Sequence, residues 1–298
     1  MPFELAALGS ALCWSITGIL STAPSRHLGG IAYTRIRMLI VFVLMLAWTV
    51  PSGGFATIDN ADWATLLLSG LVGIFIGDTA LFTTMARLGP RRTGILFATN
   101  APMTVAITWI VFDETLGWAE IAGCALVVLG VSIAIFYGRR ANGGHALEAI
   151  HGKVLAGVAL GLLAAFCQAV GALMAKPALM NGADPVAVTA VRVGVSALAL
   201  HASLLLPITA IRARNAMNVD VLVRATAAGV IGMAFGMSLL LYAYGNGNAG
   251  IAAILSSTSP VIVLPLLWLV TRQRPSAGAW TGAVTCVAGT ALILSRAL

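Results

Sequence analysis

The sequence carries very little charge. Of its 298 residues, only 17 are Lys or Arg and 10 are Asp or Glu, so the charged fraction is 9%, against about 25% in a soluble domain. Apolar residues make up 59% of the chain before its 32 glycines are counted. Too few polar groups remain to cover the surface of a soluble protein of this size. The composition therefore excludes an ordinary cytosolic enzyme, a disordered chain and a nucleic-acid-binding protein.

Clusters of metal-binding or redox-active residues are also missing. The four cysteines and the four histidines stand singly along the chain, and no CxxC pattern or Cys/His cluster occurs. The sequence therefore predicts neither a disulfide framework nor a metal site. It also lacks a P-loop, so ATP-driven transport is not expected and no cofactor is predicted.

Long apolar runs fill most of the chain instead. A helix needs about 20 apolar residues to cross a bilayer. Ten stretches qualify, at roughly 4–22, 32–50, 63–86, 94–112, 117–137, 153–175, 185–206, 221–244, 250–270 and 277–295. The predicted fold class is an all-α integral membrane protein with ten transmembrane helices, embedded in the lipid bilayer. The first run lacks a basic n-region and a cleavage site, which favours a retained helix over a removable signal peptide.

The basic residues predict an orientation in the membrane. Lys and Arg concentrate in the connections after the first, third, fifth, seventh and ninth helices, whereas Asp59, Asp62, Asp113, Glu114 and Asp184 lie on the opposite side. Basic loops stay in the cytoplasm. The charge count therefore predicts a multi-pass protein of the inner membrane with both termini in the periplasm or at the exterior.

The two halves of the chain repeat one another. GLVGIFIG at 70–77 corresponds to GVIGMAFG at 229–236, and the S/T-x-x-P segment ending at Pro102 corresponds to the one ending at Pro260. Further pairs follow in the same order through both halves: Thr34 and Thr189, Arg37 and Arg192, Gly123 and Gly282, Gly130 and Gly289. Chance does not supply such an ordered series.

The repeat predicts inverted halves. We assign the first five-helix repeat to residues 1–137, the connecting loop to 138–152 and the second repeat to 153–298. Because each half has an odd number of helices, the second enters the membrane upside down relative to the first. Inverted repeats of this kind are typical of secondary transporters, whose substrate site lies near the bilayer midplane between the halves.

Several motifs resemble those of a known family. They are the W-x3-G at Trp14, the Arg early in the second helix, the S/T-x-x-P segments, and the E-x3-W-x4-G-x6-G run that begins at Glu114. Together they resemble the ten-helix EamA-type branch of the drug/metabolite transporter superfamily, over nearly the whole chain. The resemblance implies export of amino acids, including aromatic ones, or of other metabolites or drugs. Two departures are Arg272 at the counterpart of Glu114 and the absence of basic residues after the second helix, so the orientation follows the charge count.

Three kinds of function stay open at this point. The leading prediction is a secondary transporter, expected to act as a monomer, that exports a small-molecule substrate, most of all amino acids, by alternating access. Multidrug or other metabolite export is the alternative. A membrane enzyme on lipid-linked substrates would show clustered His, Asp or Glu at a membrane face, which this chain lacks, and an assembly partner without a substrate would not need the repeat.

Asp78 is the one carboxylate deep inside a predicted span. An ionisable residue at that depth is costly and is by default a functional candidate. It would carry a proton or hold a substrate amine, whereas in a structural role it would bond a neighbouring Thr or the backbone. Its counterpart in the second half is Met237, so the repeat itself does not demand a carboxylate.

The polar segments before the two prolines are the second candidate. A proline removes one helix hydrogen bond and frees a carbonyl about one turn earlier. We expect Thr99, Asn100, Ser256 and Ser257 to form a polar wall near mid-membrane, although small polar residues also serve helix packing.

Further substrate contacts are predicted from aromatic and amide side chains. These are Trp14, Phe82, Phe166, Gln168 and Tyr242. Aromatic walls suit apolar side chains of a substrate, although any single aromatic can equally face lipid. Arg37 and Arg192 are expected to snorkel or cap a helix end.

The predicted orientation can be tested with engineered cysteines. A cysteine placed in the 138–152 loop should resist an impermeant thiol reagent added to intact cells, because the loop faces the cytoplasm. A cysteine that replaces Asn60 should react. The reverse labelling pattern would show that the termini lie inside.

Overall fold

The computed structural model describes residues 1–137, 154–205, 211–271 and 276–294, and for a few of these, Phe82, Arg91 and Arg92 among them, only the backbone. All the regular elements in these segments are helical. In the first half they are α1 Phe3–Leu28, α2 Gly30–Thr49, η1 Gly54–Thr57, α3 Trp63–Gly70, η2 Leu71–Ile76, α4 Gly77–Ala98, α5 Asn100–Phe112 and α6 Trp118–Tyr137. In the second half they are α7 Val154–Leu173, α8 Lys176–Met180, α9 Pro185–Ala202, η4 Ser203–Leu205, α10 Val219–Gly229, η6 Val230–Met237, α11 Ser238–Asn246, α12 Ala249–Ser256, α13 Ser259–Thr271 and α14 Ala277–Leu294.

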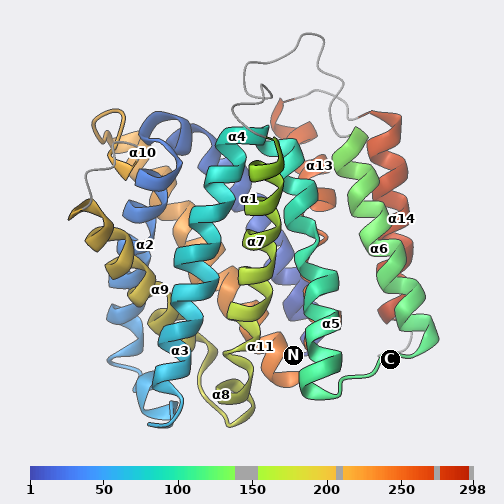
Figure 1. Cartoon of the computed structure of the whole chain (residues 1–298), viewed down its shortest axis with the longest axis horizontal. Coiled ribbons are helices and arrows are strands. Elements are labelled where there is room, and N and C mark those ends of the chain that lie inside the picture. The colour runs from blue at the N-terminus through green and yellow to red at the C-terminus, as the bar shows by residue number, and fades with distance from the viewer. Residues whose placement is uncertain (138–153, 206–210, 272–275, 295–298) are drawn as a thin grey trace.

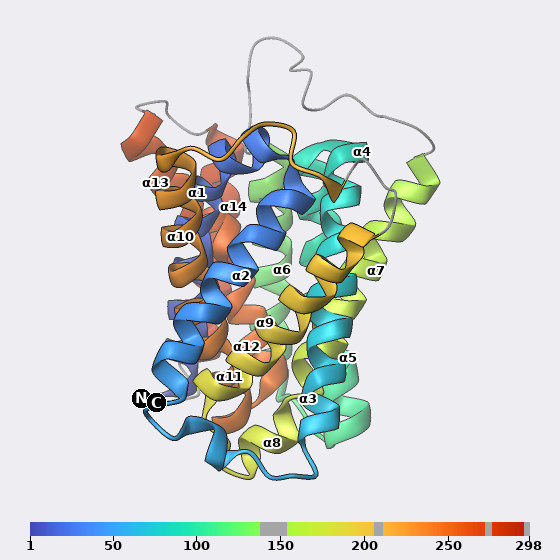
Figure 2. The same cartoon turned by 90° about the vertical axis from the view of Figure 1, so that its left-hand side faces the viewer.

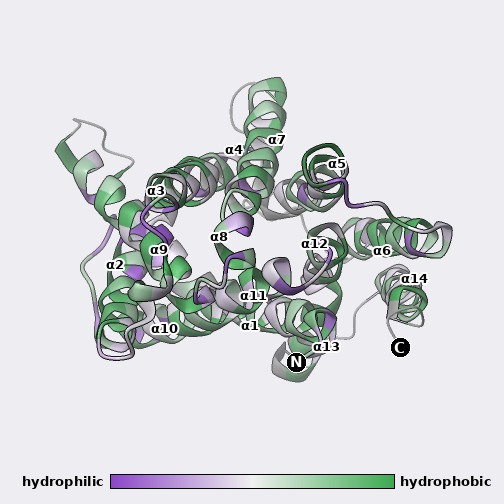
Figure 3. Cartoon of the chain, turned by 90° about the horizontal axis from the view of Figure 1, so that it is seen from below, coloured by the Kyte–Doolittle hydropathy of each residue, from purple (hydrophilic) through white to green (hydrophobic). Residues whose placement is uncertain are grey.

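The helices have the length and composition of membrane spans. Within the described residues, seven are long and apolar enough to cross a bilayer, and three shorter apolar helices occupy 96–112, 118–134 and 277–293. Hydrophobic residues predominate along the helices when the bundle is viewed from below (Figure 3). Many large apolar side chains are exposed, including Trp118 at 88% and Leu155 at 80%. Such an exterior suits lipid and confirms the prediction of a multi-pass membrane protein.

α4 extends further than the predicted third span. Helical hydrogen bonding continues from Gly77 through Pro90 to Ala98, where we expected a connection between spans 63–86 and 94–112. The chain nevertheless reverses direction within this element. A Cβ added to Gly161 of α7 would lie 2.7 Å from Leu96 and 3.2 Å from Thr84, so these two residues, which a straight helix would hold about 18 Å apart, lie side by side. The predicted connection between the two spans is therefore a helical turn.

The last helix of each half packs against the other at glycine. A Cβ on Gly130 of α6 would lie 2.6 Å from the carbonyl oxygen of Gly282 in α14, and one on Gly289 would lie 2.6 Å from that of Gly123. The pairing order shows that α6 and α14 run antiparallel, as Figure 1 shows at its right edge. Small residues let backbones approach closely where lipid provides no hydrophobic drive.

Two further antiparallel contacts relate the halves reciprocally. α7 lies along η2 and α4, where Gly171 meets Gly73 and Cys167 meets Gly77. α1 lies along η6, where Thr17 meets Gly232. The first span of each half therefore packs on the glycine triad of the other half.

The glycine triads coincide with local changes of helix type. Leu71–Ile76 and Val230–Met237 are both π-helical, although α-helix flanks each of them. π-Helical turns are rare and occur often at functional sites. Their presence at equivalent positions agrees with the repeat.

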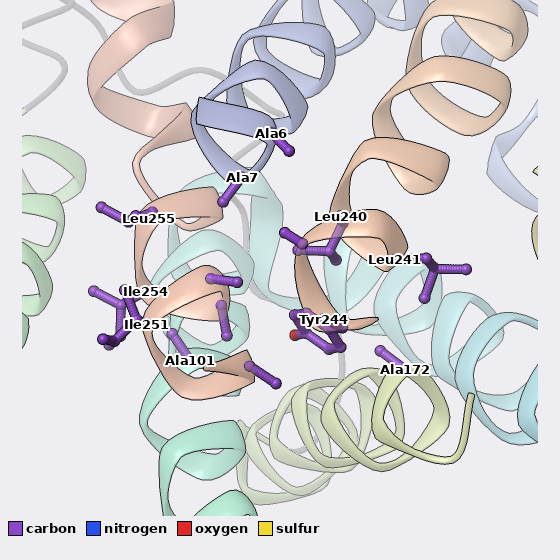
Figure 4. Packing of buried hydrophobic residues seen from close by; sticks show 14 of the residues in the cluster. Ala6, Ala7, Ala101, Ala172, Leu240, Leu241, Tyr244, Ile251, Ile254 and Leu255 are labelled. Carbon is purple, nitrogen blue, oxygen red and sulfur yellow. The ribbon is translucent and has the colours of Figure 1, made fainter. Parts of the chain in front are cut away.

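The apolar core lies where helices of both halves meet. Figure 4 shows Ala6 and Ala7 of α1, Leu240 and Leu241 of α11, and Ile251 of α12 around one centre. The described ends of α1 and α14 lie at the same end of the bundle (Figures 1 and 2). An even number of crossings would produce this arrangement.

The α6–α14 contact predicts an asymmetric response to added methyl groups. Gly130→Ala should lower the free energy of unfolding by about 1–3 kcal/mol, because its Cβ would overpack against α14. Gly18→Ala is the control, since a Cβ there meets nothing within 4 Å and alanine favours helix. Thermal unfolding in detergent measures both, and equal melting temperatures for the two variants would contradict this packing.

Candidate functional site

A buried ion pair joins α2 to the start of α4. Arg37 Nη2 lies 4.0 Å from Asp78 Oδ2, and the two side chains are 8% and 15% exposed. The π-helical η2 ends directly before Gly77 and so sets the direction of Asp78. The pair is loose, because neither Asp78 Oδ2 nor Arg37 Nε has a hydrogen-bond partner within the described residues. Asp78 thus keeps an acceptor free inside the bundle.

Arg192 occupies the equivalent position in the second half but forms no ion pair with a carboxylate of the described residues. It is 0% exposed, and its Nη1 lies 3.5 Å from Met237 Sδ. Its Nε and Nη2 have no hydrogen-bond partner in the part of the chain that the structure describes. The expectation that Arg192 snorkels or caps a helix is wrong, because it lies within α9 and reaches no surface.

The predicted polar segments form the helix breaks. α4 ends at Ala98 and α5 begins at Asn100, and in the second half α12 ends at Ser256 and α13 begins at Ser259. α5 and α12 pack against each other, so the two breaks belong to neighbouring helices of opposite halves.

The hydroxyls at these breaks bond mainly to their own backbone. Thr99 Oγ1 donates to the Leu96 carbonyl at 2.6 Å, and Ser257 Oγ donates to the Ile254 carbonyl at 2.7 Å. The Ser256 carbonyl, which Pro260 leaves without a helix donor, accepts from Ser259 Oγ at 3.1 Å. Their backbone bonds leave lone pairs on the hydroxyl oxygens of Thr99 and Ser257, both half-buried.

The predicted aromatic residues do not gather at one point. Trp14 Nε1 donates to the Gly232 carbonyl at 3.0 Å, so it seals the contact between α1 and η6. Tyr242 donates to the Met1 carbonyl at 3.1 Å near the end of the bundle. Phe166 is 49% exposed on α7, and Gln168 is half-buried on the same helix. The side chain of Phe82 lies outside the described residues.

A second ion pair, which the sequence did not predict, closes the lower end of the bundle. Lys176 at the start of α8 donates to Glu114 Oε1, and Lys176 Nζ lies 5.1 Å from the centre of the Phe112 ring. Glu114 Oε2 also accepts from the backbone N–H of Ala249 at 3.0 Å, at the start of α12. One carboxylate thus ties the α5–α6 connection to two elements of the other half. Its position in the E-x3-W run was a signal, but its partner is far away in the sequence.

The described surface also holds an open groove of about 240 Å³ between η2, α4 and α7. Phe75, Ile76 and Leu163 are among its mainly apolar lining residues. None of the predicted substrate residues is among the lining residues that the structure describes. Among the described residues, no group of three or more His, Cys, Asp or Glu could hold a metal ion.

Comparisons with known proteins agree with this architecture. The sequence model of the EamA-like transporter family matches residues 1–136 and 155–295. A solved crystal structure titled only as that of a protein has a TM-score of 0.79 and 17% sequence identity, over 99% of this chain and 98% of that chain. At this identity the likeness concerns the fold alone. A search of curated proteins finds no match.

The Glu114–Lys176 pair predicts strong coupling between the two positions. Glu114→Gln or Lys176→Met alone should cost about 3–5 kcal/mol of unfolding free energy, because each leaves a buried charge without a partner. The double variant should recover much of this loss. Thermal unfolding of all four proteins measures the coupling.

The exposed pair of Asp220 and Arg224 is the matched control. Its side chains are 66% and 47% exposed, so the same cycle with Asp220→Asn and Arg224→Met should show a coupling of at most about 1 kcal/mol. Additive losses at Glu114 and Lys176 would show that the lower pair does not hold the halves together.

Proposed function

Because the chain belongs to the EamA-like transporter family, we propose that it exports small organic solutes, most of all amino acids or related metabolites, by secondary transport across the inner membrane. The family is one of membrane transporters of the drug/metabolite type. The identity of the solute, the direction of transport and the transport mechanism go beyond the family and are what we propose. The observation that carries it is the reciprocal packing of the two halves.

The proposed architecture has ten spans in two inverted repeats. Seven long helices and three shorter apolar ones in the described residues supply that number. The antiparallel course of α6 and α14, the last spans of the two halves, supports the inversion. So does the position of both described helix ends at one end of the bundle (Figure 1).

Reciprocal contacts supply a physical route to alternating access. α1 packs on η6 while α7 packs on η2, so each half makes an equivalent contact with the other. Two arrangements related by exchanging the halves would then have similar free energies, one open to each side of the membrane. Glycine at the contacts lets the helices slide with little side-chain obstruction.

The Glu114–Lys176 pair supports a state closed at its lower end. The pair and the Ala249 N–H bond join the halves on that side through a buried charge. At the other end the halves are joined by hydrogen bonds to backbone carbonyls, such as that from Arg35 to Ile211. The start of α10 (Val219–Gly229) lies at the opposite end (Figure 2), and Arg212, Arg214 and Arg224 belong to this helix or to the residues just before it. Following the basic-loop argument, we propose that the upper end faces the cytoplasm and that both termini face the periplasm.

The proposed solute site lies between the halves near Asp78 and the helix breaks. Asp78, Thr99, Asn100, Ser256 and Ser257 would contact polar groups of the solute. Trp14, Phe82, Phe166, Gln168 and Tyr242 remain proposed contacts in other states of the cycle. Multidrug export is a second candidate, because the apolar groove beside η2 would admit amphipathic molecules from the lipid.

Asp78→Asn separates a transport role from a structural one. The substitution keeps the shape and removes the charge, so solute efflux from liposomes should fall by about tenfold or more, or lose its pH dependence, while the protein still folds. Asp220→Asn is the control, because that carboxylate is exposed on α10. A native rate together with a native pH profile in Asp78→Asn would eliminate the role of this carboxylate.

A further inference from the structure

The unpaired charge of Arg192 is the strongest unexplained feature of the bundle. A guanidinium stays protonated in proteins, and burying it without a counter-charge is costly. Yet Arg192 is 0% exposed, and no carboxylate among the described residues forms an ion pair with it. Two of its three nitrogens also have no hydrogen-bond acceptor there.

The repeat shows that a counter-ion present in the first half has no equivalent beside Arg192 among the described residues. In the first half, Arg37 of α2 faces Asp78, which follows the glycine triad. In the second half, Arg192 of α9 faces Met237, the counterpart of Asp78. The same scaffold position thus has an internal counter-ion in one half and a thioether in the other.

Arg192 also lies where both π-helical segments come together. A Cβ on Gly73 of η2 would lie 3.0 Å from Arg192 Nη2, and Met237 ends η6. Tyr244 of α11, which is also buried, lies near the guanidinium and near Thr104 of α5. The group therefore sits between helices that belong to both halves and that must move during alternating access.

We propose that Arg192 binds the carboxylate of the transported solute, an inference that rests on the export function proposed above. A guanidinium binds a carboxylate through two parallel hydrogen bonds, and Arg192 has two nitrogens to offer. A single carboxylate charge matches its single positive charge. A phosphate would need more than one positive charge, and the charge of Arg37 is already paired with Asp78.

The pair of sites suits an amino acid. Asp78 follows Gly73 on the same continuous helix from η2 into α4, and it retains a free acceptor. A zwitterion would present its carboxylate to Arg192 and its ammonium group to Asp78. The closed structure keeps Arg192 from water, so solute entry requires the opening that transport supplies.

Binding of matched acids and amides tests the inference. The protein in lipid nanodiscs is titrated with leucine and phenylalanine and with their carboxamides, and thermal stabilisation is recorded. Wild type should bind the acids at least about tenfold more tightly than the amides. Arg192→Gln should abolish that preference. Arg192→Lys should retain part of it, because an ammonium group keeps the positive charge but cannot donate two parallel hydrogen bonds as a guanidinium does. Arg224→Gln, at an exposed arginine, should leave it unchanged.

Stability of the solute-free protein separates binding from a structural role. If Arg192 is kept for its ligand, Arg192→Met removes an unpaired buried charge and should melt at or above the wild-type temperature. A clearly lower melting temperature would assign Arg192 to the scaffold and overturn the inference. An unchanged acid preference in Arg192→Gln, or no binding of either acid to wild type, would overturn it as well.

Efflux from liposomes distinguishes this inference from the proposed function. A wild type that exports the carboxamides as fast as the acids would leave export standing and contradict the role of Arg192. A wild type that binds the acids through Arg192 but moves neither across the membrane would contradict export and leave the binding site standing.

Discussion

A bilayer provides no water for backbone N–H and C=O groups, so every crossing segment must satisfy them within the protein. Most of the chain does so through helices, and side chains serve backbone groups where helices meet. Ser259 donates to the carbonyl that Pro260 leaves free, Ser69 donates to Gly171, and Ser196 donates to Gly70 at 2.9 Å. The same serines join helices of different halves, so the constraint on the backbone also determines where the halves touch.

The packing is nearly symmetric, whereas the charges are not. Glycine triads, π-helical turns and helix breaks recur in both halves, which is what exchange between two similar states requires. A solute has no such symmetry, and the groups that would bind it differ accordingly. Arg37 has Asp78 beside it and Arg192 has Met237. This difference leaves a carboxylate oxygen of Asp78 and the guanidinium of Arg192 without hydrogen-bond partners among the described residues. It does so without changing the glycine contacts along which the two halves would move.

The sequence predicts the features that depend on local chemistry. Apolar runs identify the spans, and the prolines at 102 and 260 identify the breaks. Pro90 and the arginines after it predict a turn between two spans, and Thr84 and Leu96 do meet at Gly161 of α7. The sequence fails where a contact depends on a residue far away in the chain. Most of the site is likewise non-local, because nothing near Arg192 in the sequence reveals its burial, and Glu114 and Lys176 meet only in the fold.

The central claim is that the two halves exchange conformations so that the ends of the bundle open in turn. Spin-label distances between the halves at both ends test it most directly, with one pair at Tyr137 and Val219 near the upper end and another at Leu5 and Met180 near the lower end, all exposed positions. When an amino acid is added, the account predicts opposite changes, with one distance lengthening in the molecules in which the other shortens. Two distances that stay fixed, or that lengthen together, would contradict it.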